Sequence, residues 1–144
     1  MATSTMDLVF GVARDLRRRY HAALEPWGIS PHQARALAVI AEQDPELPRL
    51  GVVAERLRIT PRAATEVVDA LEDLGYVERR ADPTDRRAVA LALTKEGRAA
   101  QRRFRAARDA AGAEYFASLS DAERERLTAL LQGVVAAHEH ERRC

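Results

Sequence analysis

The segment between Thr60 and Gly75 constrains the fold more than any other part of this chain of 144 residues. Thr60 is a favourable N-cap residue, Pro61 suits the first helical turn, and Gly75 supplies the left-handed residue that ends many helices. Apolar side chains recur at helical spacing on one face, at Ala64, Val67, Val68, Leu71 and Leu74. The sequence therefore predicts a helix over residues 61–74 that docks on a core by one face and leaves the other face free.

The segments on either side of this helix predict a winged helix-turn-helix. Residues 50–57 have helical spacing, and only three residues separate them from Pro61, which is the spacing of a helix-turn-helix. Residues 76–80 and 88–94 are short extended runs joined by a turn-rich, basic loop. In a winged helix the second helix enters a major groove and the hairpin tip reaches the neighbouring minor groove. The predicted fold class is mainly α with a small β-hairpin wing.

Long amphipathic segments lie toward both ends of the chain. Residues 7–24 carry apolar side chains four positions apart, and further stripes follow in the last third of the sequence. These stripes comprise Phe104, Ala107, Ala111 and Tyr115, then Leu127, Leu131 and Val134. Ser120 with Glu123 has the sequence of a capping box, as does Ser30 with Gln33. Such stripes would be exposed on a single copy of the chain, and pairing with a second copy would cover them.

Composition argues against several classes of protein. The single cysteine, Cys144, cannot form an internal disulfide, and no apolar run approaches the ~20 residues of a membrane span. Because the N-terminus also lacks a signal core, we expect a cytoplasmic protein without a membrane partner. The sequence has no glycine-rich phosphate loop and no nucleophile with an obvious base, so neither an enzyme nor a cofactor is expected. His138 and His140 point to different sides of a helix, which favours a solvated helix end over a metal site.

Local charge matters more than the net charge, which at +1 is low for a protein that binds nucleic acid. Residues 79–87 hold four arginines against two aspartates, whereas residues 61–74 hold one arginine against four acids. A helix that enters the groove N-terminus first keeps residues 60–66 near the DNA and turns Asp69 and Asp73 away from the phosphates. We therefore expect contacts from the first turns of the helix and modest non-specific affinity.

Several motifs resemble the MarR family of bacterial transcriptional regulators, and the resemblance covers nearly the whole chain. Residues 29–37 look like the family's second helix and residues 53–57 like its third. The most specific matches are residues 68–72 with 75–79, and residues 82–87 with 93–97. The resemblance implies a single MarR-like domain over residues 1–144. It would consist of a winged helix-turn-helix at about 31–94, flanked by dimerisation helices at about 5–25 and 97–141.

The resemblance also assigns roles to individual side chains. It implies that Asp85 and Arg87 form a pair at the wing tip, in which the carboxylate orients the arginine toward the minor groove. Glu66 departs from the family, because many members have a basic residue after the helix threonine; a carboxylate can instead accept from a cytosine amino group. The predicted DNA contacts are Thr60, Arg62, Ala63, Thr65 and Glu66 in the helix, and Asp85, Arg86 and Arg87 in the wing.

These observations predict a homodimeric, sequence-specific transcriptional regulator, and a repressor rather than an activator. Its two recognition helices would lie about 34 Å apart on a pseudo-palindromic operator in double-stranded DNA. Family members commonly bind small aromatic molecules between the dimer helices and the winged domain, which implies an effector. Tyr20, Trp27 and His32 are candidate effector contacts, and core packing explains them equally well. The alternative is a winged-helix protein-interaction module without sequence-specific DNA binding; the acidic helix face favours it, and Arg86 and Arg87 argue against it.

Overall fold

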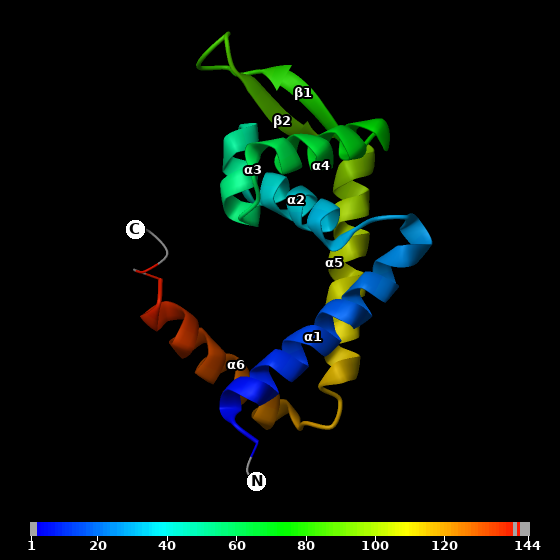
Figure 1. Cartoon of the computed structure of the whole chain (residues 1–144). Coiled ribbons are helices and arrows are strands. Elements are labelled where there is room, and N and C mark those ends of the chain that lie inside the picture. The colour runs from blue at the N-terminus through cyan, green and yellow to red at the C-terminus, as the bar shows by residue number, and fades with distance from the viewer. Residues whose placement is uncertain (1–2, 140, 142–144) are drawn as a thin grey trace. The chain divides into compact units, whose positions relative to one another are not determined.

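The computed structural model describes residues 3–139 and 141, which fold as a chain of helices with a two-stranded β-hairpin (Figure 1). They form two compact units, one up to Ala111 and one from Gly112 onward. In chain order the elements are α1 (Thr5–Leu24), the 3-10 turn η1 (Glu25–Trp27), α2 (Pro31–Glu42), α3 (Leu50–Leu57), α4 (Pro61–Asp73), β1 (Val77–Ala81), β2 (Val89–Leu93), α5 (Lys95–Tyr115) and α6 (Asp121–Ala137). The predicted fold class, mainly α with a small β-hairpin wing, is confirmed.

Two residues considered in the sequence analysis, His140 and Cys144, lie outside the described residues.

Side-chain caps fix where the helices begin. The hydroxyls of Ser30 and Ser120 each accept from the backbone N–H three residues later, and the side chain there accepts from the serine N–H in return. Both predicted capping boxes are therefore confirmed. Thr60 caps α4 in the predicted way, since its Oγ1 accepts from Ala63 N at 3.1 Å. Ser4 caps α1, which begins slightly earlier than the apolar spacing predicts.

The turn between α3 and α4 is the three-residue connection that the sequence predicts. Arg58 ends α3 in the left-handed conformation, with φ at 55°, which few residues other than glycine adopt. Ile59 N then donates to Ala54 O at 3.1 Å, so the backbone groups at the end of α3 are satisfied by the turn. At the far end of α4, Gly75 is left-handed as predicted, with φ at 78°.

The core of the first unit lies where α2, α3 and α4 meet the hairpin and the first half of α5 (Figure 1). Its largest fully buried side chains are Phe104, Leu24, Leu37, Leu71, Leu91, Val39, Val53, Val68 and Val77. The predicted docking face of α4 is buried at Ala64, Val68 and Leu71, but Leu74 is 46% exposed. The prediction for Leu74 is wrong because this residue is the C-cap, where the chain already leaves the helix axis.

The hairpin is held along one edge by the segment before α3. β1 and β2 pair antiparallel, with Val77 opposite Leu93 and Ala81 opposite Val89, within one residue of the predicted runs. Arg49 forms an isolated bridge to Ala90. The wing is thereby attached to the helix-turn-helix by backbone as well as by side chains.

A close junction joins the end of the hairpin to α5. Thr94 N donates to Tyr76 O at 3.0 Å, and Thr94 Oγ1 donates to Gly75 O at 2.6 Å while accepting from Gly97 N at 2.9 Å. A Cβ atom at Gly97 would lie 1.9 Å from Tyr76 O. Only glycine fits there without a shift of backbone.

Large apolar side chains are exposed on each unit. In α1 of the first unit they are Met6, Leu8, Val9 and Phe10, and in α6 of the second unit they are Leu130, Leu131, Val134 and Val135. Leu8 and Leu131 belong to the stripes that the sequence predicts to be covered by a second copy. No helix within residues 3–139 is both long enough and apolar enough to span a membrane.

Candidate nucleic-acid interface

The first turns of α4 present two charged side chains to solvent. Arg62 is 91% exposed, and its Nε lies 3.6 Å from Glu66 Oε1, one turn further along the helix. The sequence predicts both as DNA contacts, and the structure brings them together. Ion pairs this exposed contribute little to stability, so Arg62 can exchange Glu66 for a base or a phosphate at small cost.

Three other predicted contacts in α4 lie closer to the helix backbone. The Thr60 side chain caps the helix, and Thr65 Oγ1 donates to Pro61 O at 3.0 Å. Ala63 supplies the N–H that Thr60 caps, and its methyl group is half-buried. Each threonine hydroxyl therefore has a hydrogen-bond partner in the backbone of the first turn of α4.

The acidic side of α4 is partly neutralised by the wing. Arg79 of β1 donates to Asp69 Oδ1 at 2.6 Å and to Glu72 Oε2 at 2.9 Å. These bonds raise the pKa of Arg79 above its ordinary value, and the hydrogen bond that Arg79 donates to Asp69 is the largest cause. Sequence reasoning identifies the acids but misses this partner, since residues ten positions apart in different elements give no local signal.

Asp82 anchors the base of the wing loop. Its side chain is 9% exposed and accepts from Thr84 N at 2.8 Å, from Thr84 Oγ1 at 2.7 Å and from Arg49 Nε at 2.8 Å. The hydrogen bonds from Thr84 and Arg49 hold the pKa of this carboxyl far below its ordinary value. The sequence predicts a turn-rich loop here, but the contact of Asp82 with Arg49, thirty-three positions earlier, is missed.

The predicted wing-tip pair meets in a different way from the one expected. Asp85 Oδ1 accepts from the backbone N–H of Arg87 at 3.0 Å, and Asp85 Oδ2 lies 4.0 Å from Arg49 Nη2. Arg86 and Arg87 are exposed, and neither side chain forms a hydrogen bond or ion pair within the part of the chain that the structure describes. Asp85 therefore shapes the backbone beneath Arg87 and leaves the guanidinium unpaired.

A separate pocket of about 450 Å³ lies in the first unit, between α1, α2 and α5. It is lined among others by Tyr20, Arg35, Glu42, Phe104, Arg105 and Arg108. Burial raises the pKa of the Tyr20 hydroxyl, although the charges of Arg108 and Arg35 oppose the shift. Of the three predicted effector contacts, only Tyr20 lines this pocket.

The other two predicted effector contacts lie outside the pocket. Trp27 packs against Phe104 of the pocket lining, with ring centroids 5.5 Å apart, but does not itself line the pocket. His32 is exposed in the first turn of α2. Sequence reasoning also misses the three arginines of the pocket, because they come from two helices separated by some seventy positions.

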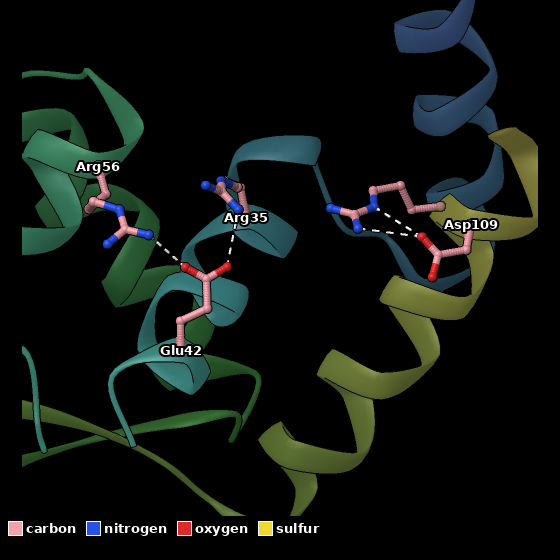
Figure 2. A network of polar contacts seen from close by, with 5 residues as sticks. Arg35, Glu42, Arg56 and Asp109 are labelled. Atoms are coloured by element: carbon pink, nitrogen blue, oxygen red, sulfur yellow. Dashed lines mark hydrogen bonds and ion pairs between the residues drawn. The ribbon is translucent and has the colours of Figure 1, made fainter. Parts of the chain in front are cut away.

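Glu42 connects the pocket to the helix-turn-helix. Its Oε1 lies 3.5 Å from Arg35 Nη1, and its Oε2 accepts from Arg56 Nη2 at 2.7 Å. Figure 2 shows this carboxylate between the two guanidinium groups, one from α2 and one from α3. Two ion pairs that share Glu42 therefore link Arg35, at the pocket, to Arg56 of α3.

Comparison with known proteins agrees with this geometry. The family model described as "MarR family" matches residues 27–88, which include α2, α3, α4 and β1. An HTH-type transcriptional regulator of Mycobacterium bovis is 33% identical over 122 residues, covering 84% of this chain and 82% of the relative. The HTH-type transcriptional repressor Rv2887 of Mycobacterium tuberculosis is 31% identical over 125 residues, covering 87% and 88%. The chain belongs to the MarR family.

Solved structures of MarR-family and related proteins share the fold. The MarR-family protein Rv2887 of Mycobacterium tuberculosis, in complex with salicylic acid, superposes with a TM-score of 0.75 at 27% identity, over 92% of this chain and 97% of that one. CouR from Rhodococcus jostii, bound to p-coumaroyl-CoA, also gives a TM-score of 0.75, at 30% identity and 89% coverage of each chain.

Proposed function

We propose that this MarR-family chain is a ligand-responsive, homodimeric transcriptional repressor that binds a pseudo-palindromic operator through α4 and the wing. It acts in the cytoplasm, by binding rather than by catalysis. One observation carries the proposal. Among the residues that the structure describes, the side chains of Arg86 and Arg87 have no ion-pair partner, and the base of their loop is fixed by Asp82 and Arg49. An arginine held at the tip of a rigid hairpin suits the negative potential of a narrow minor groove.

The recognition surface is proposed to be Thr60, Arg62, Ala63, Thr65 and Glu66 of α4, with Asp85, Arg86 and Arg87 of the wing. Arg62 supplies the group best suited to reading guanine, because a guanidinium can donate to O6 and N7 together. Arg79 forms ion pairs with Asp69 and Glu72 and so neutralises much of the negative charge on the acidic face of α4. Because the alternative function, a protein-interaction module, depends on that acidic face, these ion pairs argue against it.

A homodimer is supported by the exposed apolar side chains of α1 and α6. Each of these helices has a row of large apolar residues that a single chain leaves open to water, and a second copy would bury them. The winged helix-turn-helix at about 31–94 and the flanking dimerisation helices at about 5–25 and 97–141 would then form one domain. The dimer sets the separation of the two recognition helices.

An effector is supported by the pocket and by the relatives. The pocket is large enough for a small molecule, and both solved neighbours named above hold an aromatic anion. An effector changes DNA affinity only if it binds one arrangement of the recognition helices better than another.

Fluorescence anisotropy with DNA from the region flanking the chain's own coding sequence tests the function. We expect saturable binding that survives excess scrambled DNA and needs two half-sites. Binding that is equal on scrambled DNA would contradict a sequence-specific regulator.

A further inference from the structure

We propose that Glu66 determines the specificity of α4 at the expense of affinity: it weakens binding to DNA of any sequence and favours a cytosine beside the guanine that Arg62 reads. The inference rests on the proposed function and deepens it, because it gives one residue two opposite effects on DNA binding. Glu66 is the only acid among residues 60–68, the part of α4 expected to lie nearest the DNA. Its side chain is 72% exposed.

The order of Arg62 and Glu66 along the chain does not favour the helix. Arg62 lies in the first turn of α4, where the helix dipole favours a negative charge and where the structure has no acid. Glu66 follows four positions later, which is the less favourable order for an ion pair at this spacing. Because the reverse order would stabilise α4 better, helix stability does not account for the pair.

The contact between the two side chains leaves Arg62 able to donate to DNA. Arg62 Nε lies 3.6 Å from Glu66 Oε1, which is too long for a hydrogen bond, and Arg62 donates no hydrogen bond among residues 3–139 and 141. Both Nη groups can therefore donate to O6 and N7 of a guanine. When the helix enters a groove and water is excluded, the attraction at Nε strengthens and holds the guanidinium in one direction.

A carboxylate in the major groove distinguishes between the edges of the bases. An ionised carboxylate only accepts hydrogen bonds, so Glu66 attracts the amino groups of cytosine and adenine and repels the acceptors of guanine and thymine. Cytosine is favoured over adenine because its edge presents the amino donor alone, whereas adenine adds the acceptor N7. Arg62 and Glu66 together therefore read a guanine with a cytosine at a neighbouring position.

The same negative charge weakens binding to every sequence. Phosphates line the groove, and a carboxylate there opposes the attraction that the arginines supply. The other acids of α4 are placed differently. Asp69 and Glu72 are neutralised by Arg79, and Asp73 is the last residue of the helix. Glu66 is therefore the acid of α4 whose removal should change DNA affinity most.

Fluorescence anisotropy with a scrambled duplex tests the loss of affinity and needs no operator. Glu66→Gln keeps the shape of the side chain and removes its charge. We expect this variant to bind the scrambled duplex about threefold or more tightly than the wild type at low salt, with a smaller gain as salt is added. Asp73→Asn makes the same change of charge at the far end of α4 and should gain much less. Equal gains in the two variants, or no gain in Glu66→Gln, would overturn the proposal whether or not the chain has an operator.

Operator duplexes with single base changes test the base preference. In Glu66→Gln the ratio of operator affinity to scrambled-duplex affinity should fall about tenfold, with the loss confined to one cytosine position. Glutamine both donates and accepts, so the preference there should relax toward adenine. An unchanged ratio, or a loss spread over all positions, would contradict base reading by Glu66. A wild-type ratio of one would contradict the proposed function together with this base preference, whereas the effect on scrambled DNA is measured independently.

A swapped pair, Arg62→Glu with Glu66→Arg, separates base reading from helix stability. It keeps both side chains and the net charge but places the acid in the first turn, so Tm should be unchanged or higher. Operator affinity should nevertheless fall about tenfold or more, because the two base contacts are exchanged. Operator affinity equal to that of the wild type would show that the pair serves the helix alone and would overturn the proposal.

Discussion

Arg49 Nε donates to Asp82 Oδ2 at 2.8 Å, and this contact joins the residue before α3 to the base of the wing. The same segment pairs with β2 through the bridge between Arg49 and Ala90. The wing is therefore fixed to the helix-turn-helix at two points, which sets the position of its tip relative to α4. Precise placement of both elements is what a protein needs to read a major groove and the adjacent minor groove together.

Asp82→Asn tests this anchor. The amide keeps the shape of the side chain but loses the charge that accepts from Arg49 and Thr84. We expect a fall in Tm of several degrees and weaker operator binding, with the dimer intact. Asp73→Asn, on the exposed end of α4, is the control and should change neither quantity. Thermal denaturation and anisotropy measure the two effects.

The same carboxyl predicts a pH dependence. Hydrogen bonds from Thr84 and Arg49 hold the folded-state pKa of Asp82 below the ordinary value of 3.8. A group whose pKa is depressed by folding adds stability above its unfolded pKa and loses it as the pH falls toward the folded value. The difference in stability between wild type and Asp82→Asn should therefore be constant near neutral pH and shrink below about pH 4. A difference that grows in acid would contradict this assignment.

Gly97→Ala tests the junction between the hairpin and α5. The added methyl group would meet Tyr76 O at 1.9 Å, so backbone must move. We expect a loss of about 1–3 kcal/mol in the free energy of unfolding, or more. Gly112→Ala lies in the same helix with nothing within 4 Å of the new atom, and should be neutral or stabilising by up to about 1 kcal/mol. Equal effects of the two variants in urea unfolding would show that the junction is not tight.

Arg62→Ala tests the major-groove contact. If Arg62 pairs with guanine, the change should cost about 1–3 kcal/mol per half-site and relax preference at one base position. The fold should be unaffected, because the Arg62 to Glu66 pair is highly exposed. Binding to a panel of operators with single base changes distinguishes the roles. A uniform loss across the panel would make Arg62 a phosphate contact, and no loss would remove it from the interface.

Leu131→Asp tests the proposed dimer. Leu131 is 47% exposed on the described chain, so a charge there does little harm unless a second copy covers it. Sedimentation should show monomers, and operator binding should fall with the dimer. Ala122→Asp places the same charge in the exposed first turn of α6 and should remain dimeric. An intact dimer with full affinity in Leu131→Asp would place the interface elsewhere.

Local signals in the sequence predict the elements well and the contacts between them poorly. Thr60, Ser30 and Gly75 act within three or four residues of the chain, so their roles as caps and turns can be read directly. The prediction that Leu74 lies on the buried face is wrong, because helical spacing does not show at which residue a helix stops packing against the core. The left-handed Arg58 is likewise unforeseen, since the surrounding turn rather than the residue type imposes its conformation.

The site contacts that the sequence misses are all between distant segments. Arg49 with Asp82, Arg79 with Asp69, and Glu42 with Arg56 join residues ten to thirty-three positions apart. Which of many arginines meets which acid depends on the packing of whole helices, and no short pattern encodes it. The resemblance to the family supplies the roles of Asp85 and Arg87, and the structure adds that their contact runs through the backbone of Arg87.

Operator titration of Arg87→Ala tests most directly whether the wing tip binds DNA. Arg103→Ala, an exposed arginine on α5, is the control for loss of one positive charge. We expect Arg87→Ala to weaken operator binding strongly and to reduce the salt dependence by about one ion, with the fold and dimer intact. Asp85→Ala should reproduce part of the loss, and the double variant should lose less than the sum of the two. Additive effects would make Asp85 a turn residue only, and operator affinity in Arg87→Ala equal to that of Arg103→Ala would contradict a DNA-binding wing.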